Sequence, residues 1–185
     1  FSLSDYVVVP SESVREDLVA EQLFERQRIF VVPYGIDASF FEVQNDPNPG
    51  NALFVGSVSL AKGIQYLASA ARHSVPRARI PLSFAVAGNA PDSIRQQPEC
   101  ENLTFLGRVP RTAVRGLYQK ADVLVFPTLS DSFGAVMLEA MAAGVPVICS
   151  PYCASVVRDG IDGRVVEPRD TAAFSAAILQ VTQDR

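Results

Sequence analysis

The stretch DSFGAVMLEAMAAGVPV, residues 131–147, places a polar turn before an apolar run that ends in Gly144 and Pro146. Glycine followed by proline is typical of a helix C-terminus, so the run predicts a short, largely buried helix. One carboxylate, Asp131, stands before this helix, and a second, Glu139, stands inside it among apolar neighbours. A buried carboxylate without a partner is costly. The pair therefore indicates a site for a polar ligand, against the simpler interpretation of a solvated turn and a surface helix.

Apolar runs alternate with helical patterns along the whole chain. Eight runs lack polar alternation, which is typical of strands buried on both faces. They cover Tyr6–Val9, Ile29–Val32, Ala52–Val55, Leu82–Ala87, Leu103–Leu106, Val123–Phe126, Val147–Cys149 and Arg164–Val166. The helical patterns cover Glu12–Glu25, Gly63–Ser74, Arg111–Lys120, Gly134–Ala143 and Thr171–Thr182. This order predicts an α/β fold with a doubly wound parallel sheet, in which the last six strands form one complete unit.

Composition excludes several classes of protein. Hydrophobic residues make up 48% of the 185 residues, and the formal net charge is -4. The chain is therefore expected to fold, and it lacks the basic surface of a nucleic-acid-binding protein. No apolar run reaches the ~18 residues of a membrane span. Three cysteines without a regular framework predict buried thiols in a reducing compartment, and with a single histidine they predict no metal site.

Glycine and polar residues follow the predicted strands at their carboxyl ends, where open parallel sheets bind ligands. Gly56, Ser57 and Lys62 follow the third run, and Arg108 and Val109 follow the fifth. Gly56 permits close approach of the backbone to a ligand, and Lys62 supplies a point charge for a phosphate. The chain has neither a G-x-G-x-x-G nor a Walker A sequence. Taken alone, this turn therefore fits an ordinary strand-to-helix connection with an exposed lysine better than a ligand site.

The turn that precedes the buried helix is more informative. Ser11 and Ser132 are the predicted N-caps of the first and fourth helices. A helix N-terminus at Ser132 would bind an anion through free amides and the helix dipole. Asp131 could reach a hydroxyl beside that anion, and the two oxygens of Glu139 suit a vicinal diol such as a ribose. The free amides would be those of Phe133, Gly134, Ala135 and Val136.

At these residues the chain resembles the donor-binding domain of retaining glycosyltransferases with the GT-B fold, in the large sucrose/glycogen-synthase-like group. The family motif, Glu-x7-Glu around E-G-F-G and L-E-A-M-A-x-G-x-P-V, stands here as DSFGAVMLEAMAAGVPV. Further matching segments follow in family order: VVPYGID, FVGSVSLAKG, NLTFLGRV, ADVLVFPT and RDGIDGRVVEP. The resemblance covers nearly the whole chain. It implies a Rossmann-like domain that forms the C-terminal half of such an enzyme.

The resemblance also implies a role for each matching residue. Lys62 would bind the donor diphosphate and stabilise the leaving group, Asp131 would contact the hexose, and Glu139 would hold the ribose hydroxyls. These three are the expected catalytic residues. Further contacts to the donor are expected from Gly56, Ser57, Arg108, Val109, Ser132, Phe133, Gly134, Ala135 and Val136. The donor would be a UDP-, GDP- or ADP-sugar, and the family generally needs no metal or other cofactor.

Two positions depart from the family pattern. Ser57 stands where the family often has an arginine that partners the lysine, so stabilisation of the leaving group is weakened unless Arg108 or a residue of the N-terminal domain compensates. Asp131 replaces the first glutamate and is one methylene shorter, so the hexose would sit differently. Both departures favour an alternative, a non-catalytic nucleotide-sugar-binding module.

The resemblance divides the chain at the sequence NDPNPG. Residues 1–43 would be a strand-helix-strand remnant of the N-terminal acceptor domain, residues 44–50 the interdomain linker, and residues 51–185 the donor-binding domain. The chain begins without methionine and is interpreted as a fragment that binds donor but transfers nothing. Open strand edges in the remnant predict packing on the donor domain or dimerisation with a second copy. A cytoplasmic location is expected, with any peripheral membrane contact made by the missing domain.

The leading interpretation is transfer of a hexose, with retention, from a nucleotide diphosphate sugar to a sugar or lipid-linked acceptor. A sugar-nucleotide 2-epimerase would need acid/base carboxylates and histidines, whereas His73 is the single histidine and lies far from the predicted crevice. A nicotinamide-dependent dehydrogenase would need the glycine fingerprint that the chain lacks. The base, the sugar and the acceptor are not readable from the sequence.

Overall fold

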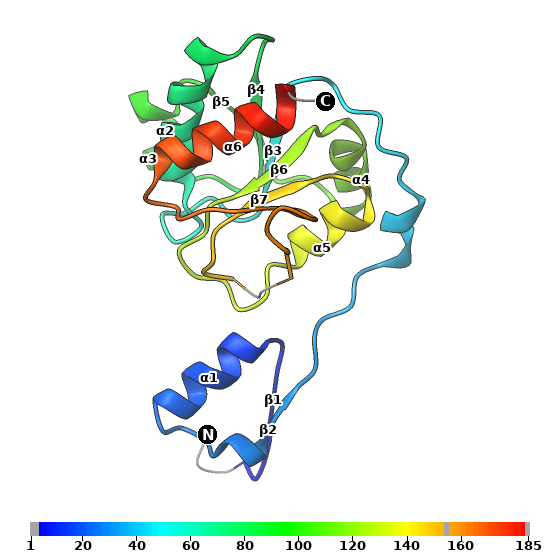
Figure 1. The fold of residues 1–185 in the computed structure, drawn as a ribbon, viewed down its shortest axis with the longest axis vertical. Helices are drawn as coiled ribbons and strands as arrows, with labels where there is room; N and C mark the ends of the chain where they lie inside the picture. The colour runs from blue at the N-terminus through cyan, green and yellow to red at the C-terminus, as the bar shows by residue number, and fades with distance from the viewer. Residues whose placement is uncertain (1–3, 154–155, 184–185) are drawn as a thin grey trace.

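The computed structural model describes residues 4–153 and 156–183 and contains two parallel sheets (Figure 1). The strands are β1 (Val7–Val9), β2 (Ile29–Val31), β3 (Asn51–Val55), β4 (Ser83–Ala87), β5 (Leu103–Gly107), β6 (Val123–Phe126), β7 (Val147–Cys149) and β8 (Gly163–Val165). The α-helices are α1 (Glu12–Ala20), α2 (Ile64–Ser74), α3 (Asp92–Arg95), α4 (Arg111–Lys120), α5 (Ala135–Ala142) and α6 (Thr171–Gln183). Short 3-10 helices are η1 (Arg26–Arg28), η2 (Ala38–Glu42), η3 (Val75–Arg77) and η4 (Pro98–Cys100).

The larger sheet has the strand order β5-β4-β3-β6-β7-β8, and every neighbouring pair is parallel. The chain runs outward from β3 through β4 to β5, returns to β6 beside β3, and runs outward again through β7 to β8. This is the 3-2-1-4-5-6 order of the doubly wound Rossmann fold. The predicted fold class is confirmed. The topological switch point, where such folds bind ligands, lies between the carboxyl ends of β3 and β6.

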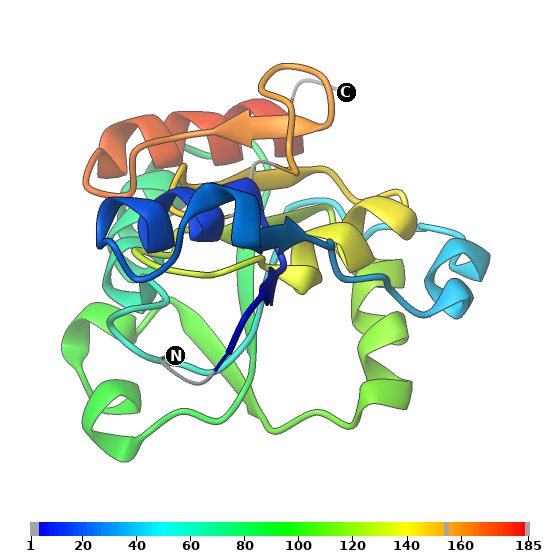
Figure 2. The same ribbon diagram turned by 90° about the horizontal axis from the view of Figure 1, so that it is seen from below.

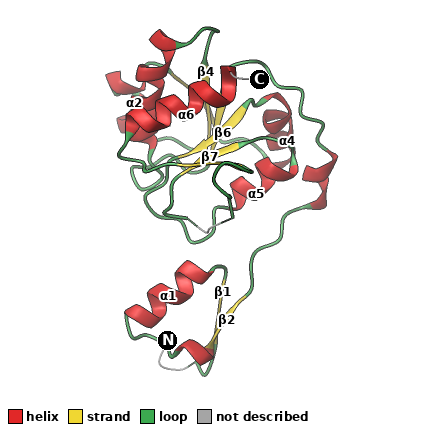
Figure 3. Cartoon of the chain, in the orientation of Figure 1, coloured by secondary structure: helices red, strands yellow, loops and turns green. Residues whose placement is uncertain are grey.

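Burial on both faces explains why the strands lack polar alternation. The four residues of β6 and the three central residues of β3 are at most 2% exposed. Helix α2 packs against α6. Helices α4 and α5 lie side by side, across the strands of the sheet from α2 (Figure 3).

All eight predicted strands are present, and each boundary lies within one residue of its prediction. The same holds for four of the five predicted helices. The one-turn helix α3 was not predicted, because four residues are too few to show a helical period.

The predicted helix over residues 12–25 is wrong at its C-terminus, because α1 ends at Ala20. Gln22 adopts the left-handed conformation with φ 55°, and the Leu23 amide donates to the Leu18 carbonyl at 3.0 Å. This is the Schellman closure of a helix end, which glycine usually makes. No glycine marks it here, so the sequence carried no stop signal. The N-terminus was predicted correctly, since Ser11 accepts a hydrogen bond from the Val14 amide.

The small sheet of β1 and β2 belongs to an N-terminal strand-helix-strand unit that an extended segment joins to the larger sheet (Figure 1). Seen from below, this unit lies in front of the larger sheet (Figure 2). In the described part of the chain, no helix is both long and apolar enough to cross a membrane.

Candidate functional site

The candidate site lies at the switch point, where the turns after β3, β6 and β7 are hydrogen-bonded to one another. The Leu129 amide donates to the Ala61 carbonyl at 2.8 Å, and the Thr128 hydroxyl donates to the same carbonyl at 3.2 Å. The Asp131 amide donates to the Tyr152 carbonyl at 3.0 Å. These bonds hold the three turns in a fixed arrangement at the carboxyl end of the sheet.

The turns after β3 and β4 approach so closely that only glycine fits. A Cβ atom on Gly88 would lie 1.7 Å from the carbonyl oxygen of Gly56. The Gly56 amide donates to the Ala87 carbonyl at 3.0 Å. The close backbone approach that was predicted at Gly56 is thus made, in this structure, to the neighbouring turn of the same chain.

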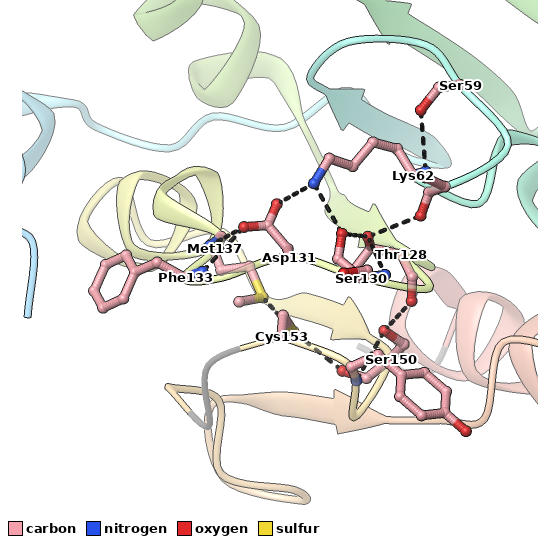
Figure 4. A network of polar contacts seen from close by, with 12 residues as sticks. Ser59, Lys62, Thr128, Ser130, Asp131, Phe133, Met137, Ser150 and Cys153 are labelled. Atoms are coloured by element: carbon pink, nitrogen blue, oxygen red, sulfur yellow. Dashed lines mark hydrogen bonds and ion pairs between the residues drawn. The ribbon is translucent and has the colours of Figure 1, made fainter. Parts of the chain in front are cut away.

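Lys62 and Asp131, 69 positions apart in sequence, form the central ion pair of the site (Figure 4). The Lys62 Nζ atom lies 2.7 Å from Asp131 Oδ2 and donates to the Ser130 carbonyl at 3.0 Å. The two side chains are 24% and 18% exposed. The structure therefore brings together the two predicted residues from the turns after β3 and β6.

Gly134, and not Ser132, is the N-cap residue of helix α5, and Asp131 binds the turn just before it. The Oδ1 atom of Asp131 accepts from the amides of Phe133 at 3.0 Å and Gly134 at 2.9 Å. The prediction of Ser132 as N-cap is wrong, and so is the expectation that these two amides are free. Asp131 stands four residues before the first helical residue, Ala135, and its side chain bonds to amides two and three residues further along the chain, as aspartates in turns often do. Gly134 completes this turn in the left-handed conformation, with φ 71°. The side chain of Ser132 is exposed.

The first amides of α5 remain oriented toward the turn. Ala135 and Val136 open the helix, and amides in a first helical turn have no acceptor inside the helix. Together with Lys62 they offer a positive field at the end of β6. The anion site predicted from four amides is therefore reduced to the last two, with Asp131 occupying the first two.

The charges around Asp131 outweigh its burial. Burial raises the pKa of this carboxyl, but the Lys62 ammonium and the amides of Phe133 and Gly134 together hold it below the usual range. Asp131 is therefore ionised at neutral pH, and its ion pair with Lys62 is intact.

Glu139 is largely buried on α5, with a side chain 13% exposed, so the interpretation as a surface residue is wrong. It is also not without partners. The Tyr118 hydroxyl donates to Glu139 Oε2 at 3.1 Å, and Arg111 Nη2 lies 3.9 Å from Oε1. Burial raises the pKa of Glu139, and Tyr118 and Arg111 offset this effect only in part.

Ser57, Arg108 and Val109 lie along the same edge of the sheet, in the turns after β3 and β5. Ser57 and Arg108 are exposed, whereas Val109 is partly buried against the core. Strand β5 is two positions from β3, so Arg108 belongs to a different part of the edge than Lys62.

The N-terminal unit closes one side of the site. Ser11 Oγ donates to the Ser132 carbonyl at 2.8 Å, and the ring of Tyr34 meets that of Phe133 edge-on at 5.2 Å. A cavity of about 430 Å³ lies between α1 and the turns after β6 and β7, with Asp17 and Asp131 in its lining. The predicted packing of the N-terminal unit on the larger one is therefore present at these contacts.

The arrangement joins one cation, a helix N-terminus and two carboxylates of opposite pKa shift at the edge of a parallel sheet. A lysine and first-turn amides stabilise negative charge that develops on a bound group. The described residues contain no group of three or more His, Cys, Asp or Glu side chains that could hold a metal ion. The three cysteines are free and buried, as predicted.

Sequence reasoning missed Thr128, Tyr118 and Ser150. The Ser150 hydroxyl donates to the Thr128 carbonyl at 2.5 Å and stabilises the turn after β6 (Figure 4). Ser150 directly follows β7 and Thr128 stands two residues after the end of β6, and a polar residue just after a buried strand is a signal that sequence analysis can use. Tyr118 looks in the sequence like an ordinary core residue of an amphipathic helix, and only its partner on α5 reveals its polar contact.

A family model described as "Glycosyl transferases group 1" matches residues 49–184. A D-inositol 3-phosphate glycosyltransferase from a Mycobacterium species (strain KMS) is 29% identical over 194 aligned positions, and the alignment covers 95% of this chain and 44% of that protein. The O-antigen chain mannosyltransferase B of Escherichia coli is 35% identical over 142 aligned positions, and the alignment covers 73% of this chain and 37% of that protein.

Among solved structures, the fold is similar to Anabaena Alr3699/HepE in complex with UDP-glucose. The TM-score is 0.83 at 16% identity, over 98% of this chain and 55% of that one. The chain thus spans about half the length, or less, of the proteins it resembles.

Proposed function

This chain belongs to the glycosyl transferases group 1 family, and from this premise we propose that it is the donor-binding portion of a retaining glycosyltransferase. It would transfer a hexose from a nucleotide diphosphate sugar to a sugar or lipid-linked acceptor. Residues 1–43 would be the remnant of the acceptor domain, residues 44–50 the linker and residues 51–185 the donor domain. The activity of the whole enzyme would then need the acceptor half.

The observation that carries this proposal is the position of Lys62 at the switch point, beside the N-terminus of α5. A nucleoside diphosphate is the ligand whose charge suits a lysine and first-turn amides at this place. A structure of similar fold, Anabaena Alr3699/HepE, is described in complex with UDP-glucose, which supports the same chemistry here.

In the proposed reaction, the bond between the hexose anomeric carbon and the diphosphate oxygen would break, and the diphosphate would leave with the electron pair. An acceptor hydroxyl would bond to the same carbon and give its proton to the leaving diphosphate. Lys62 and the amides of Ala135 and Val136 would stabilise the charge on that oxygen. Glu139 would hold the ribose hydroxyls, and Asp131 would contact the hexose. Because Asp131 is now the partner of Lys62, donor binding would exchange this carboxylate for the diphosphate. Gly56, Ser57, Arg108 and Val109 would line the base and diphosphate.

Thermal unfolding with UDP, GDP and ADP at about 1 mM tests the proposal. A ligand at 100 times its dissociation constant stabilises a protein by about 2.7 kcal/mol, or roughly 5–10 °C at this size. We expect a shift with one nucleotide that is lost in Lys62→Ala and in Glu139→Ala. Lys120→Ala is the matched control, because this lysine pairs with Asp46 away from the site. No shift with any nucleotide would contradict the proposal.

The second candidate function is a non-catalytic nucleotide-sugar-binding module. The contact that favours it is the Lys62–Asp131 pair itself, since a lysine held by a carboxylate is less available to a leaving group, and Ser57 adds no charge. Turnover of a donor by the chain joined to its acceptor half separates the two functions. Nucleotide binding without any turnover would support the module.

A further inference from the structure

Tyr118 is a buried residue whose hydroxyl contacts Glu139, and the proposed mechanism gives it no role. It lies near the end of α4 and is 0% exposed. Its hydroxyl reaches two acceptors on α5, Glu139 Oε2 at 3.1 Å and the Val136 carbonyl at 3.2 Å. A phenol has one proton, so it donates to one acceptor at a time. Burial, with Glu139 nearby, raises the pKa of Tyr118, so this proton is kept throughout the physiological range.

The two oxygens of Glu139 have unequal surroundings. Oε2 is held by the buried phenol, whereas Oε1 faces Arg111, whose side chain is 72% exposed and whose Nη2 is 3.9 Å away. A separation of 3.9 Å is too long for a hydrogen bond. Among the described residues, Oε1 has this long ion pair with Arg111 and accepts no hydrogen bond, so it can still accept one from a ligand hydroxyl.

The ring of Tyr118 is fixed from the side of the extended segment that leads into the larger sheet. Phe40 of η2, which is 1% exposed, meets it edge-on with ring centroids 5.8 Å apart. The Asn45 amide donates to the carbonyls of Tyr118 at 3.0 Å and Ala121 at 2.9 Å. The phenol is consequently held in one place before any ligand arrives.

We propose that Tyr118 is a positioning residue that holds Oε2 of Glu139 so that Oε1 is presented to the ribose hydroxyls of the donor. The inference rests on the proposed function, in which Glu139 binds the ribose. A purely structural tyrosine would stabilise the fold without affecting recognition of the sugar hydroxyls. The distinguishing quantity is therefore the preference for a ribonucleotide over its 2′-deoxy counterpart.

The experiment measures dissociation constants by calorimetry for UDP, GDP and ADP and for their 2′-deoxy forms. A hydrogen bond to a charged acceptor gives the ribonucleotide an advantage of about tenfold in the unmodified chain. We expect Tyr118→Phe to reduce this advantage to about threefold or less, and Glu139→Gln to remove most of it. In the double variant, the two effects should not add, because the tyrosine acts through the glutamate.

Ser74→Ala is the matched control for a lost buried hydroxyl. Ser74 is 0% exposed and contacts the Ala70 carbonyl at 2.7 Å and Ser175 Oγ at 3.0 Å, at the α2–α6 contact. It should lower the unfolding temperature and leave the ribose preference unchanged. If Tyr118→Phe does not fold, Phe40→Leu keeps the hydroxyl but loosens the ring, and it should lower the preference at least about twofold.

The outcomes separate the two levels of inference. An unchanged preference in Glu139→Gln overturns the proposed ribose contact itself. A reduced preference in Glu139→Gln with an unchanged preference in Tyr118→Phe overturns the positioning role and leaves the ribose contact standing.

Discussion

Asp131 connects the two halves of the site through three contacts made by one carboxylate. One oxygen accepts from the two amides just before α5, and the other pairs with Lys62. A glutamate, one methylene longer, could leave these amides and extend into the crevice, whereas the aspartate is held in the turn before the helix. The departure from the family motif at this position therefore has a structural consequence, which is a lysine that already has an anionic partner.

This pairing predicts how Asp131 affects stability. Asp131→Asn keeps a capping oxygen but loses the charge, so it should destabilise the fold by about 1–2 kcal/mol at pH 7. The folded-state pKa of Asp131 is lowered, so its stabilisation is present above the unfolded value of about 3.9 and is lost as pH falls through the folded value. Urea unfolding of both chains at pH 7 and below pH 4 measures the difference.

The difference between Asp131→Asn and the unmodified chain should shrink in acid. Asp46→Asn is the control, because Asp46 pairs with Lys120 on the exposed surface and its loss should have a smaller effect. A difference that stays constant from pH 7 to pH 3 would mean that capping alone, without the ion pair, is what Asp131 contributes.

The pKa of Glu139 is raised, whereas that of Asp131 is lowered, so removing the charge of Glu139 should stabilise the fold at neutral pH. Burial raises its pKa, so ionisation costs stability, and this cost builds up as pH rises from about 4.3 to the raised value. Glu139→Gln removes the charge and keeps an oxygen for Tyr118. We expect it to raise the unfolding temperature at pH 7 while weakening nucleotide binding.

The test of Glu139→Gln is calorimetric unfolding at pH 4 and pH 7, paired with nucleotide titration. The gain in unfolding temperature should be larger at pH 7 than at pH 4. A variant that loses stability at pH 7 would indicate that Arg111 and Tyr118 compensate fully for burial of the charge.

At the scale of elements, the C-terminus of α1 gives the clearest prediction. Gln22 holds a left-handed conformation with φ 55°, which costs a non-glycine residue of the order of 1 kcal/mol. Gln22→Gly should therefore stabilise this helix end by about 0.5–1 kcal/mol. Hydrogen exchange of the Leu23 amide, which donates to the Leu18 carbonyl, measures it directly.

Gln27→Gly is the matched control, because Gln27 lies in η1 and does not have a positive φ. It should be neutral or destabilising, since glycine there only adds freedom to the unfolded chain. Faster exchange at Leu23 in Gln22→Gly would contradict the assignment of strain to this residue.

The elements differ in how much the sequence reveals of them. The strands could be predicted within one residue, because an unbroken run such as that of β6 is determined by burial on both faces. The C-terminus of α5 was equally clear, since Gly144 adopts φ 75° and the Val145 amide closes the helix on the Ala140 carbonyl. The end of α1 was not, because Gln22 performs a glycine's role without its signature.

The sequence also reveals the position of the site better than the contacts within it. The edge on which it lies could be predicted, because parallel strands end together and each is followed by polar residues. The contacts within it could not. The ion pair of Lys62 and Asp131 depends on how two turns, 69 positions apart in sequence, meet in space. The hydrogen bond from Tyr118 to Glu139 depends on how α4 and α5 are rotated about their axes. Local patterns predict elements, whereas side-chain partners need the tertiary arrangement.

At the scale of the whole molecule, the N-terminal unit presents an apolar surface without a core of its own. Tyr6, Val8, Phe30 and Val32 are between 53% and 65% exposed, on a parallel pair of strands. Parallel sheets normally have both faces covered. This surface suits further strands and helices of an acceptor domain, as the proposed function requires.

Tyr34 makes an apolar contact between this unit and the larger one. Its ring meets Phe133 edge-on at 5.2 Å, directly beside the amide that Asp131 caps. We expect Tyr34→Ala to free the N-terminal unit, since the Ser11–Ser132 hydrogen bond alone is worth only about 1 kcal/mol. Small-angle scattering should then give a larger radius of gyration, with the unfolding temperature of the larger unit nearly unchanged.

Phe41→Ala is the control for Tyr34→Ala, because Phe41 lies in the same connecting segment and is 70% exposed. It should leave the radius of gyration unchanged. If Tyr34→Ala also leaves it unchanged, the extended segment itself sets the orientation, and the contact with Phe133 is a consequence of it. If the radius rises, the two units separate at the site, so that opening of the crevice and release of the Phe133 turn are one event.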